Sequence, residues 1–269
     1  NLNIKLDLKV IFNNFFTSKY AKYKDKIDGN YLYYEDACIF LYLKSLLVGF
    51  NTNHVIKQVV IDEAQDYNEM QYVILGKIFK KASFTILGDV NQTINPYQKY
   101  ETLEVLTNIL NDNSKYVELN KTYRSSKEII EYTNKILGLK HISAIRRESN
   151  IPVKFRDDIK YLINDINNLK DKYKSLAIIT KDKEDAIMLY DFLKQQINEI
   201  SLMEDKDKKF NKNLVIVPSY LAKGLEFDSV ISYTSKDNMY TKKERYLYYV
   251  VATRCQHELI IYNAPKSLL

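Results

Sequence analysis

Residues 59–66 read VVIDEAQD, and this stretch indicates the fold more strongly than any other part of the chain. A short run of apolar residues that are all β-branched is typical of a parallel strand covered by helices on both faces. In open α/β sheets, ligands bind beyond the carboxyl ends of such strands. There, Asp62 can hold Mg²⁺, and Glu63 can orient and deprotonate an attacking water. The alternative is a strand that ends in a solvated acidic turn.

The rest of the chain alternates short β-branched runs with longer amphipathic stretches, so we predict an α/β fold with a parallel sheet and crossover helices. The predicted strands are Gln58–Ile61, Phe84–Leu87, Tyr116–Leu119, Pro152–Phe155, Leu176–Thr180, Leu214–Pro218, Ser229–Tyr233 and Leu259–Tyr262. The predicted helices lie at about 31–49, 68–81, 125–138, 158–174, 182–199 and 242–254. Asn68 can cap the helix after the first strand, and Ser125 with Glu128 forms a capping-box pattern.

Composition excludes several classes of protein. The chain has 269 residues and a net charge of +6, which permits one large or two ordinary domains and tolerates a polyanionic partner without requiring one. Two cysteines cannot form a disulfide framework, which fits a reducing cytoplasm. The three histidines and two cysteines do not have zinc-site spacing. No signal peptide opens the chain, and no apolar run approaches the roughly 20 residues of a membrane helix.

A second polar turn follows the next predicted strand. Residues 84–92 read FTILGDVNQ, in which Gly88 allows a tight turn. Gln92 can reach a terminal phosphate or a water on the side opposite Glu63. Such a turn is weak evidence alone, but soon after VVIDEAQD it strengthens the prediction of a phosphate site.

Three later segments carry charged residues at unusual places. Arg124 lies at a predicted helix start, where the helix dipole is already positive, so an anion explains it better than helix stability does. Its neighbour Tyr123 can stack on a base, although an ordinary exposed Tyr-Arg pair is the alternative. Residues 222–228 read AKGLEFD between two strands, and residues 247–254 read LYYVVATR. The last of these ends in Arg254, whose ordinary role there is a favourable helix cap.

In this order, the five segments resemble motifs II, III, IV, V and VI of superfamily 1 helicases of the UvrD/Rep type, over about residues 36 to 262. The likeness is greatest to the helicase IV/HelD branch, on DEAQDY at 62–67, YLAKGLEFD at 220–228 and FLYLKSLLVG at 40–49. The resemblance implies RecA-like parallel sheets with flanking helices, the P-loop NTPase fold. Residues 1–114 would form the later part of the first lobe, and residues 115–269 a complete second lobe.

The resemblance also implies the roles of the first-lobe residues. Asp62 would bind Mg²⁺, and Glu63 would activate the attacking water. Gln92 would sense the γ-phosphate of ATP and couple it to nucleic-acid binding.

The second-lobe residues would complete the ATP site. Tyr123 would stack on adenine, and Glu226 would bind the ribose, with Gly224 permitting close backbone approach. Arg124 and Arg254 would act as arginine fingers, which contribute roughly 10³–10⁵ in rate where phosphoryl transfer has been measured.

The implied activity is that of an ATP-dependent helicase. The intact motor would bind ATP and Mg²⁺ between two RecA-like lobes and step 3′ to 5′ along single-stranded or duplex DNA. It would contact the strand mostly through phosphates, with some base stacking. Some members of the HelD branch act on RNA polymerase, which makes that enzyme a second candidate partner. The expected location is cytoplasmic, with no membrane contact.

The chain departs from the family pattern in its phosphate-binding loop. The motif G-x-x-x-x-G-K-[ST] is absent: Gly76 is followed by Lys and Ile, and Gly29 and Gly49 are not followed by Lys. The adenine-reading Gln segment is also missing, and Cys255 stands where the family often has Ala. We therefore interpret the chain as the C-terminal part of a UvrD-like motor, and we expect weak order over residues 1–30.

Two other readings remain open. The chain can be a non-catalytic scaffold that has kept its lobes to bind RNA polymerase or another partner. It can also be an unrelated doubly wound protein, such as a metal-dependent phosphohydrolase or a receiver domain, although the segments at 122–126 and 222–228 would then have no explanation.

Without a phosphate loop, the 269-residue chain should show no measurable ATP hydrolysis. A phosphate-release assay on the purified chain, with and without single-stranded DNA, measures this. Turnover that DNA stimulates and that Glu63→Gln abolishes would contradict the prediction.

Overall fold

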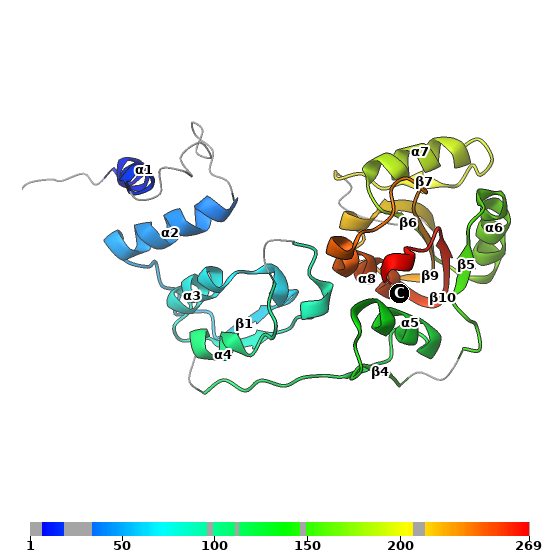
Figure 1. Ribbon diagram of the computed structural model, residues 1–269. Coiled ribbons are helices and arrows are strands. Elements are labelled where there is room, and N and C mark those ends of the chain that lie inside the picture. The colour runs from blue at the N-terminus through cyan, green and yellow to red at the C-terminus, as the bar shows by residue number, and fades with distance from the viewer. Residues whose placement is uncertain are drawn as a thin grey trace, which may run out of the picture. The chain divides into compact units, whose positions relative to one another are not determined.

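A computed structural model describes residues 7–18, 34–95, 99–110, 113–145, 149–206 and 213–268 (Figure 1). The described chain divides into two compact units. The first comprises the residues up to Val90 and those from 99 to Tyr116, and the second comprises 91–95 and the residues from Val117 onward. Of residues 1–30, for which we expected weak order, all but 7–18 lie outside the described residues, and 8–18 form a helix.

The first unit is built on a two-stranded parallel sheet of β1 (Gln58–Ile61) and β2 (Ser83–Ile86), connected by α3 (Glu69–Ile78). The strands pair in register from Gln58 against Ser83 to Ile61 against Ile86. The other helices of this unit are α1 (Leu8–Ser18), α2 (Tyr34–Val48) and α4 (Val105–Leu110). The first two predicted strands are therefore confirmed, the second one residue earlier than expected.

One face of this small sheet is buried. Its core consists of Ile61, Ala64, Tyr72, Tyr100 and Leu106. Val60, which points the other way along β1, is 63% exposed. Only one face of the β1–β2 sheet is thus well covered among the described residues.

Helix α3 begins as its sequence predicts. Asn68 caps it, since the side-chain oxygen of Asn68 accepts a hydrogen bond from the Gln71 amide at 3.0 Å. Gln71 Oε1 in turn accepts one from the Asn68 amide at 2.8 Å. This reciprocal capping box satisfies two backbone donors that a helix start otherwise leaves unpaired.

The second unit contains a six-stranded, entirely parallel sheet in the order β5-β10-β9-β6-β8-β7. Its strands are β5 (Lys154–Arg156), β6 (Leu176–Thr180), β7 (Ser201–Leu202), β8 (Leu214–Pro218), β9 (Phe227–Tyr233) and β10 (Cys255–Tyr262). The predicted bounds of β6 and β8 are the observed ones. This sheet, flanked by helices, confirms the α/β, RecA-like fold.

Helices cover both faces of the large sheet. Ile179 of β6 packs with residues of α5 (Lys127–Leu137) and α8 (Arg245–Thr253). The preceding residue, Ile178, packs on the opposite face with residues of α6 (Leu162–Lys172) and α7 (Lys183–Leu193) (Figure 1). Successive side chains of a strand alternate between faces, so two helical layers require the uninterrupted apolar runs seen in the sequence.

One predicted strand is wrong. Tyr116–Leu119 forms no strand, and the nearest one is β3 (Lys121–Thr122), which pairs with β4 (Ser143–Ala144). A short run of mostly apolar residues suggested a strand, but this segment pairs with no strand among the described residues. Its Leu119 is instead 85% exposed.

The predicted capping box of α5 is also wrong. Ser126, not Ser125, occupies the cap position and makes no capping bond with its side chain. The hydroxyl of Ser125 donates to the Cys255 carbonyl at 2.5 Å, which ties the start of α5 to β10. The Glu128 carboxylate accepts hydrogen bonds from the Ser149 hydroxyl at 2.8 Å and the Asn150 amide at 2.9 Å. Ser125 and Glu128 thus form hydrogen bonds with residues distant in sequence instead of with each other's backbone in a capping box.

Glu128 should make the stability of the second unit pH-dependent. Burial alone would raise its pKa, but backbone and Ser149 hydrogen bonds to the carboxylate outweigh burial and lower the pKa to about 2. Because the pKa of Glu128 is lower in the folded than in the unfolded protein, its carboxylate stabilises the fold at pH values above 4.5. This contribution disappears as the pH falls from 4.5 through about 2. Glu128→Gln should therefore cost about 1 kcal/mol at pH 7 and less at low pH.

Denaturant unfolding of both proteins between pH 7 and pH 2 measures this difference. Glu131→Gln, on the same helix and with its side chain 60% exposed, is the matched control and should change little. An equal loss of stability at every pH in Glu128→Gln would contradict the assignment.

Candidate functional site

The acidic turn after β1 has a strained backbone. Glu63 has φ 51° and ψ 44°, in the left-handed region that residues other than glycine rarely adopt. Its amide donates to Asp62 Oδ1 at 2.8 Å. Strain of this kind costs about 1–3 kcal/mol and concentrates at functional sites. The turn therefore presents both carboxylates at the carboxyl end of a parallel strand, in a conformation that helix or strand formation does not require.

A buried amide links this turn to the one after β2. Gln65, only 1% exposed, donates through Nε2 to Glu63 Oε2 at 2.6 Å. Its Oε1 accepts from the Asp89 amide at 3.0 Å. The turns of the two predicted motifs thus contact each other through one side chain that the sequence analysis did not single out.

Asp62 is suited to Mg²⁺. It is exposed at the strand end, and Mg²⁺ in nucleotide sites usually keeps several waters and takes one or two carboxylates with phosphate oxygens. Within the described ranges, no three His, Cys, Asp or Glu side chains form a complete protein metal site. The donor set therefore fits an ion held jointly with a phosphorylated ligand.

In the second unit, Arg124 and Glu226 form an ion pair. Arg124 Nη2 lies 2.7 Å from Glu226 Oε1, and both side chains are roughly 40% exposed. The other oxygen of Glu226 accepts from Gln256 Nε2 at 3.1 Å. Gly224, nearby in sequence, has φ +76° and open space where a Cβ would lie, so backbone conformation rather than crowding requires glycine there. Tyr123 is 73% exposed, which leaves its ring accessible.

Arg254 is in a different environment, 1% exposed at the end of α8. Its Nε donates to the Val250 carbonyl at 3.1 Å, and Nη1 donates to the Leu225 carbonyl at 3.3 Å. Its Nη2 donates to Gln92 Oε1 at 2.5 Å, within the second unit. Arg254 therefore caps its own helix and holds the 222–228 segment.

Arg124, Glu226 and Arg254 come together at the amino edge of the large sheet. Glu226 immediately precedes β9, and Arg254 immediately precedes β10. The Ser126 amide donates to the Gln256 carbonyl at 3.0 Å, which brings the start of α5 to the same edge. In the first unit, by contrast, Asp62 follows the carboxyl end of its strand.

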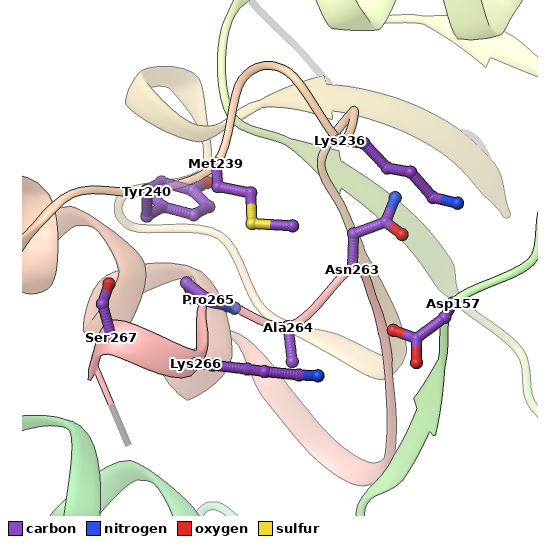
Figure 2. A pocket seen from close by; sticks show the side chains of 9 residues that line it. All are labelled: Asp157, Lys236, Met239, Tyr240, Asn263, Ala264, Pro265, Lys266 and Ser267. Carbon is purple, nitrogen blue, oxygen red and sulfur yellow. The ribbon is translucent and has the colours of Figure 1, made fainter.

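The carboxyl edge of the large sheet carries a hollow of about 450 Å³ (Figure 2). Its walls come from the segments directly after β5, β9 and β10. The lining residues are Asp157, Lys236, Met239, Tyr240, Asn263, Ala264, Pro265, Lys266 and Ser267. None of the residues predicted from the sequence lines it.

No described helix is long and apolar enough to cross a membrane.

The chain is similar to known helicases in two kinds of sequence comparison. A family model described as the UvrD/REP helicase N-terminal domain matches residues 13–113. The chain is 26% identical to the RecBCD enzyme subunit RecB of Buchnera aphidicola, over 90% of this chain and 23% of that protein. It is 25% identical to a putative ATP-dependent DNA helicase of Acanthamoeba polyphaga mimivirus, over 77% of this chain and 34% of that protein. The chain thus spans at most about a third of these two relatives.

Among solved structures, the C-terminal domain of a possible DNA helicase from Lactobacillus plantarum is 25% identical, with a TM-score of 0.44. The match covers 52% of this chain and 86% of that one.

The different environments of the two arginines predict different effects on stability. Arg254→Ala should lower the free energy of unfolding by about 2 kcal/mol or more, because it leaves buried carbonyls without their charged donor. Arg124→Ala should change it by less than about 1 kcal/mol, because its ion pair is exposed. Arg245→Ala, on the exposed side of α8, is the control. Equal losses for Arg254→Ala and Arg245→Ala in denaturant unfolding would refute the structural role of Arg254.

Proposed function

We propose that the chain is part of a UvrD/REP-type superfamily 1 helicase, an ATP-driven motor that moves along DNA. The observation that carries the proposal is the strained turn at Glu63, which presents two adjacent carboxylates at the carboxyl end of the parallel strand β1. Asp62 holds the metal ion, and Glu63 accepts a proton from the water that attacks the terminal phosphate. Bound Mg²⁺ supplies charge neutralisation on the phosphate oxygens.

Arg124 supports this proposal through the weakness of its present contact. An ion pair as exposed as Arg124–Glu226 contributes about 0–1 kcal/mol, so the guanidinium can exchange it for a phosphate at little cost. A planar guanidinium matches phosphate oxygens in a bidentate arrangement. Released from Arg124, the Glu226 carboxylate can accept hydrogen bonds from ribose hydroxyls, and the exposed ring of Tyr123 can stack on adenine.

Arg254 and Gln92 are proposed to act together. Nε and Nη1 of Arg254 donate to the Val250 and Leu225 carbonyls, whereas Nη2 donates to two side chains, Gln92 Oε1 and Thr253 Oγ1. That donor is the one we assign to a phosphate oxygen, with Gln92 reporting the presence of the γ-phosphate. Arg254 would then stabilise both the fold and the transferred phosphate.

The track is proposed to be DNA, with movement 3′ to 5′, on the family relationship and on the description of the mimivirus relative as a DNA helicase. Neither of the two relatives compared above is described as acting on RNA polymerase, so that partner stays a prediction from the sequence.

The proposal predicts the kinetics of the full-length protein that contains this chain. Glu63→Gln and Arg124→Ala should each lower kcat for DNA-stimulated ATP hydrolysis at least about 100-fold, because they remove the base and a charge-stabilising donor. Glu69→Gln, an exposed acid in the first turn of α3, makes the same charge change as Glu63→Gln and should leave kcat within about twofold. A kcat within threefold of the parent in either test variant would contradict the assigned role.

A further inference from the structure

We propose that Gln65 is a positioning residue that ties the Glu63 carboxylate to the turn after β2. The inference rests on the proposed function and adds a residue to its machinery. The Gln65 amide makes one bond in each direction: Nε2 donates to Glu63 Oε2 at 2.6 Å, and Oε1 accepts from the Asp89 amide at 3.0 Å. A single rigid amide therefore spans the two turns that follow β1 and β2.

The surroundings of Gln65 leave little room for its amide to move. Its side chain is 1% exposed, and the neighbouring Ala64 is fully buried. The Tyr72 hydroxyl donates to the Ala64 carbonyl at 2.7 Å, and the Ala64 amide donates to the Leu87 carbonyl at 2.9 Å. Because the Ala64 backbone that leads into Gln65 is held at both its amide and its carbonyl, the buried Gln65 side chain has little freedom to change direction.

Gly88 shows how closely the second turn approaches Gln65. A Cβ at position 88 would lie 2.8 Å from Gln65 Oε1 and 2.9 Å from both Ala64 Cβ and Leu103 Cδ1. These distances are shorter than real Cβ contacts, so glycine is needed here for close approach rather than for a positive φ. The turn after β2 therefore packs directly against the side-chain amide of Gln65, which donates to Glu63.

This arrangement has a chemical consequence for hydrolysis. A general base must lie within hydrogen-bond reach of the attacking water, and a misplacement of about 1 Å can cost about 100-fold in rate. Gln65 holds the Glu63 carboxylate by one oxygen and the Asp89 backbone by its own oxygen. A displacement of the turn that leads to Gln92 would therefore move the base, so Gln65 couples that turn to the orientation of Glu63.

Gln65→Glu is the selective variant. Glutamate keeps an oxygen that can accept from the Asp89 amide, but it cannot donate to Glu63 and places a second carboxylate beside it. Gln65→Met keeps the length of the side chain and removes both bonds. Gln71→Glu is the matched control, because it makes the same charge change in the same unit and glutamate retains the capping box with Asn68.

In the full-length protein, Gln65→Glu and Gln65→Met should lower kcat for DNA-stimulated ATP hydrolysis at least about tenfold, with KM for ATP within about threefold. A purely structural role would not separate kcat from KM in this way. A kcat within twofold of the parent, or an equal loss in Gln71→Glu, would overturn the proposal. If the parent itself hydrolyses no ATP, the proposed function fails instead.

A second measurement on the 269-residue chain does not depend on activity. Glu63→Gln should shift the amide NMR resonance of Asp89, because Gln65 relays the change. The same substitution should leave that resonance unchanged in a Gln65→Met background, in which the relay is absent. An equal shift of the Asp89 resonance in both backgrounds would overturn the coupling.

Discussion

Pairing of parallel strands is the constraint on which the rest of this structure depends. Parallel pairing aligns equivalent ends of strands that are far apart in sequence, so the residues that flank them gather at a common edge. In the first unit, pairing of β1 with β2 brings the turns at Glu63 and Gly88 into contact. In the second, pairing of β9 with β10 brings Glu226 and Arg254 to one edge.

The two units use opposite edges of their sheets for the candidate site residues. Asp62 and Glu63 follow the carboxyl end of β1, as the general rule for α/β proteins expects. Arg124, Glu226 and Arg254 lie at the amino edge of the large sheet, while its carboxyl edge carries a hollow lined by none of them. The connection from β8 to β9 runs through 219–226 and contains one short 3₁₀ turn. It returns the chain from the carboxyl edge to the amino edge of the sheet, which is where Glu226 lies.

Side chains to which the motifs assign similar roles differ in how deeply they are buried. Arg124 is roughly 40% exposed, and its ion pair with Glu226 is weak enough to be exchanged for another partner. Arg254 is buried and satisfies carbonyls of α8 and of the 222–228 segment, so its removal affects folding. Gln65 belongs to the acidic motif but is buried. Its side-chain amide donates a hydrogen bond to the Glu63 carboxylate.

The sequence by itself determined the fold class, the bounds of β1, β6 and β8, the cap at Asn68 and the likeness to helicases, because these depend on local periodicity, capping chemistry and motif spacing. Tertiary structure decided the rest. Tyr116–Leu119 has strand-like residues but pairs with no strand in the part of the chain that the structure describes, and Ser125 and Glu128 form hydrogen bonds with distant partners instead of capping α5. The Gln65 bridge and the burial of Arg254 arise from contacts across the sheet, whose geometry no local pattern encodes.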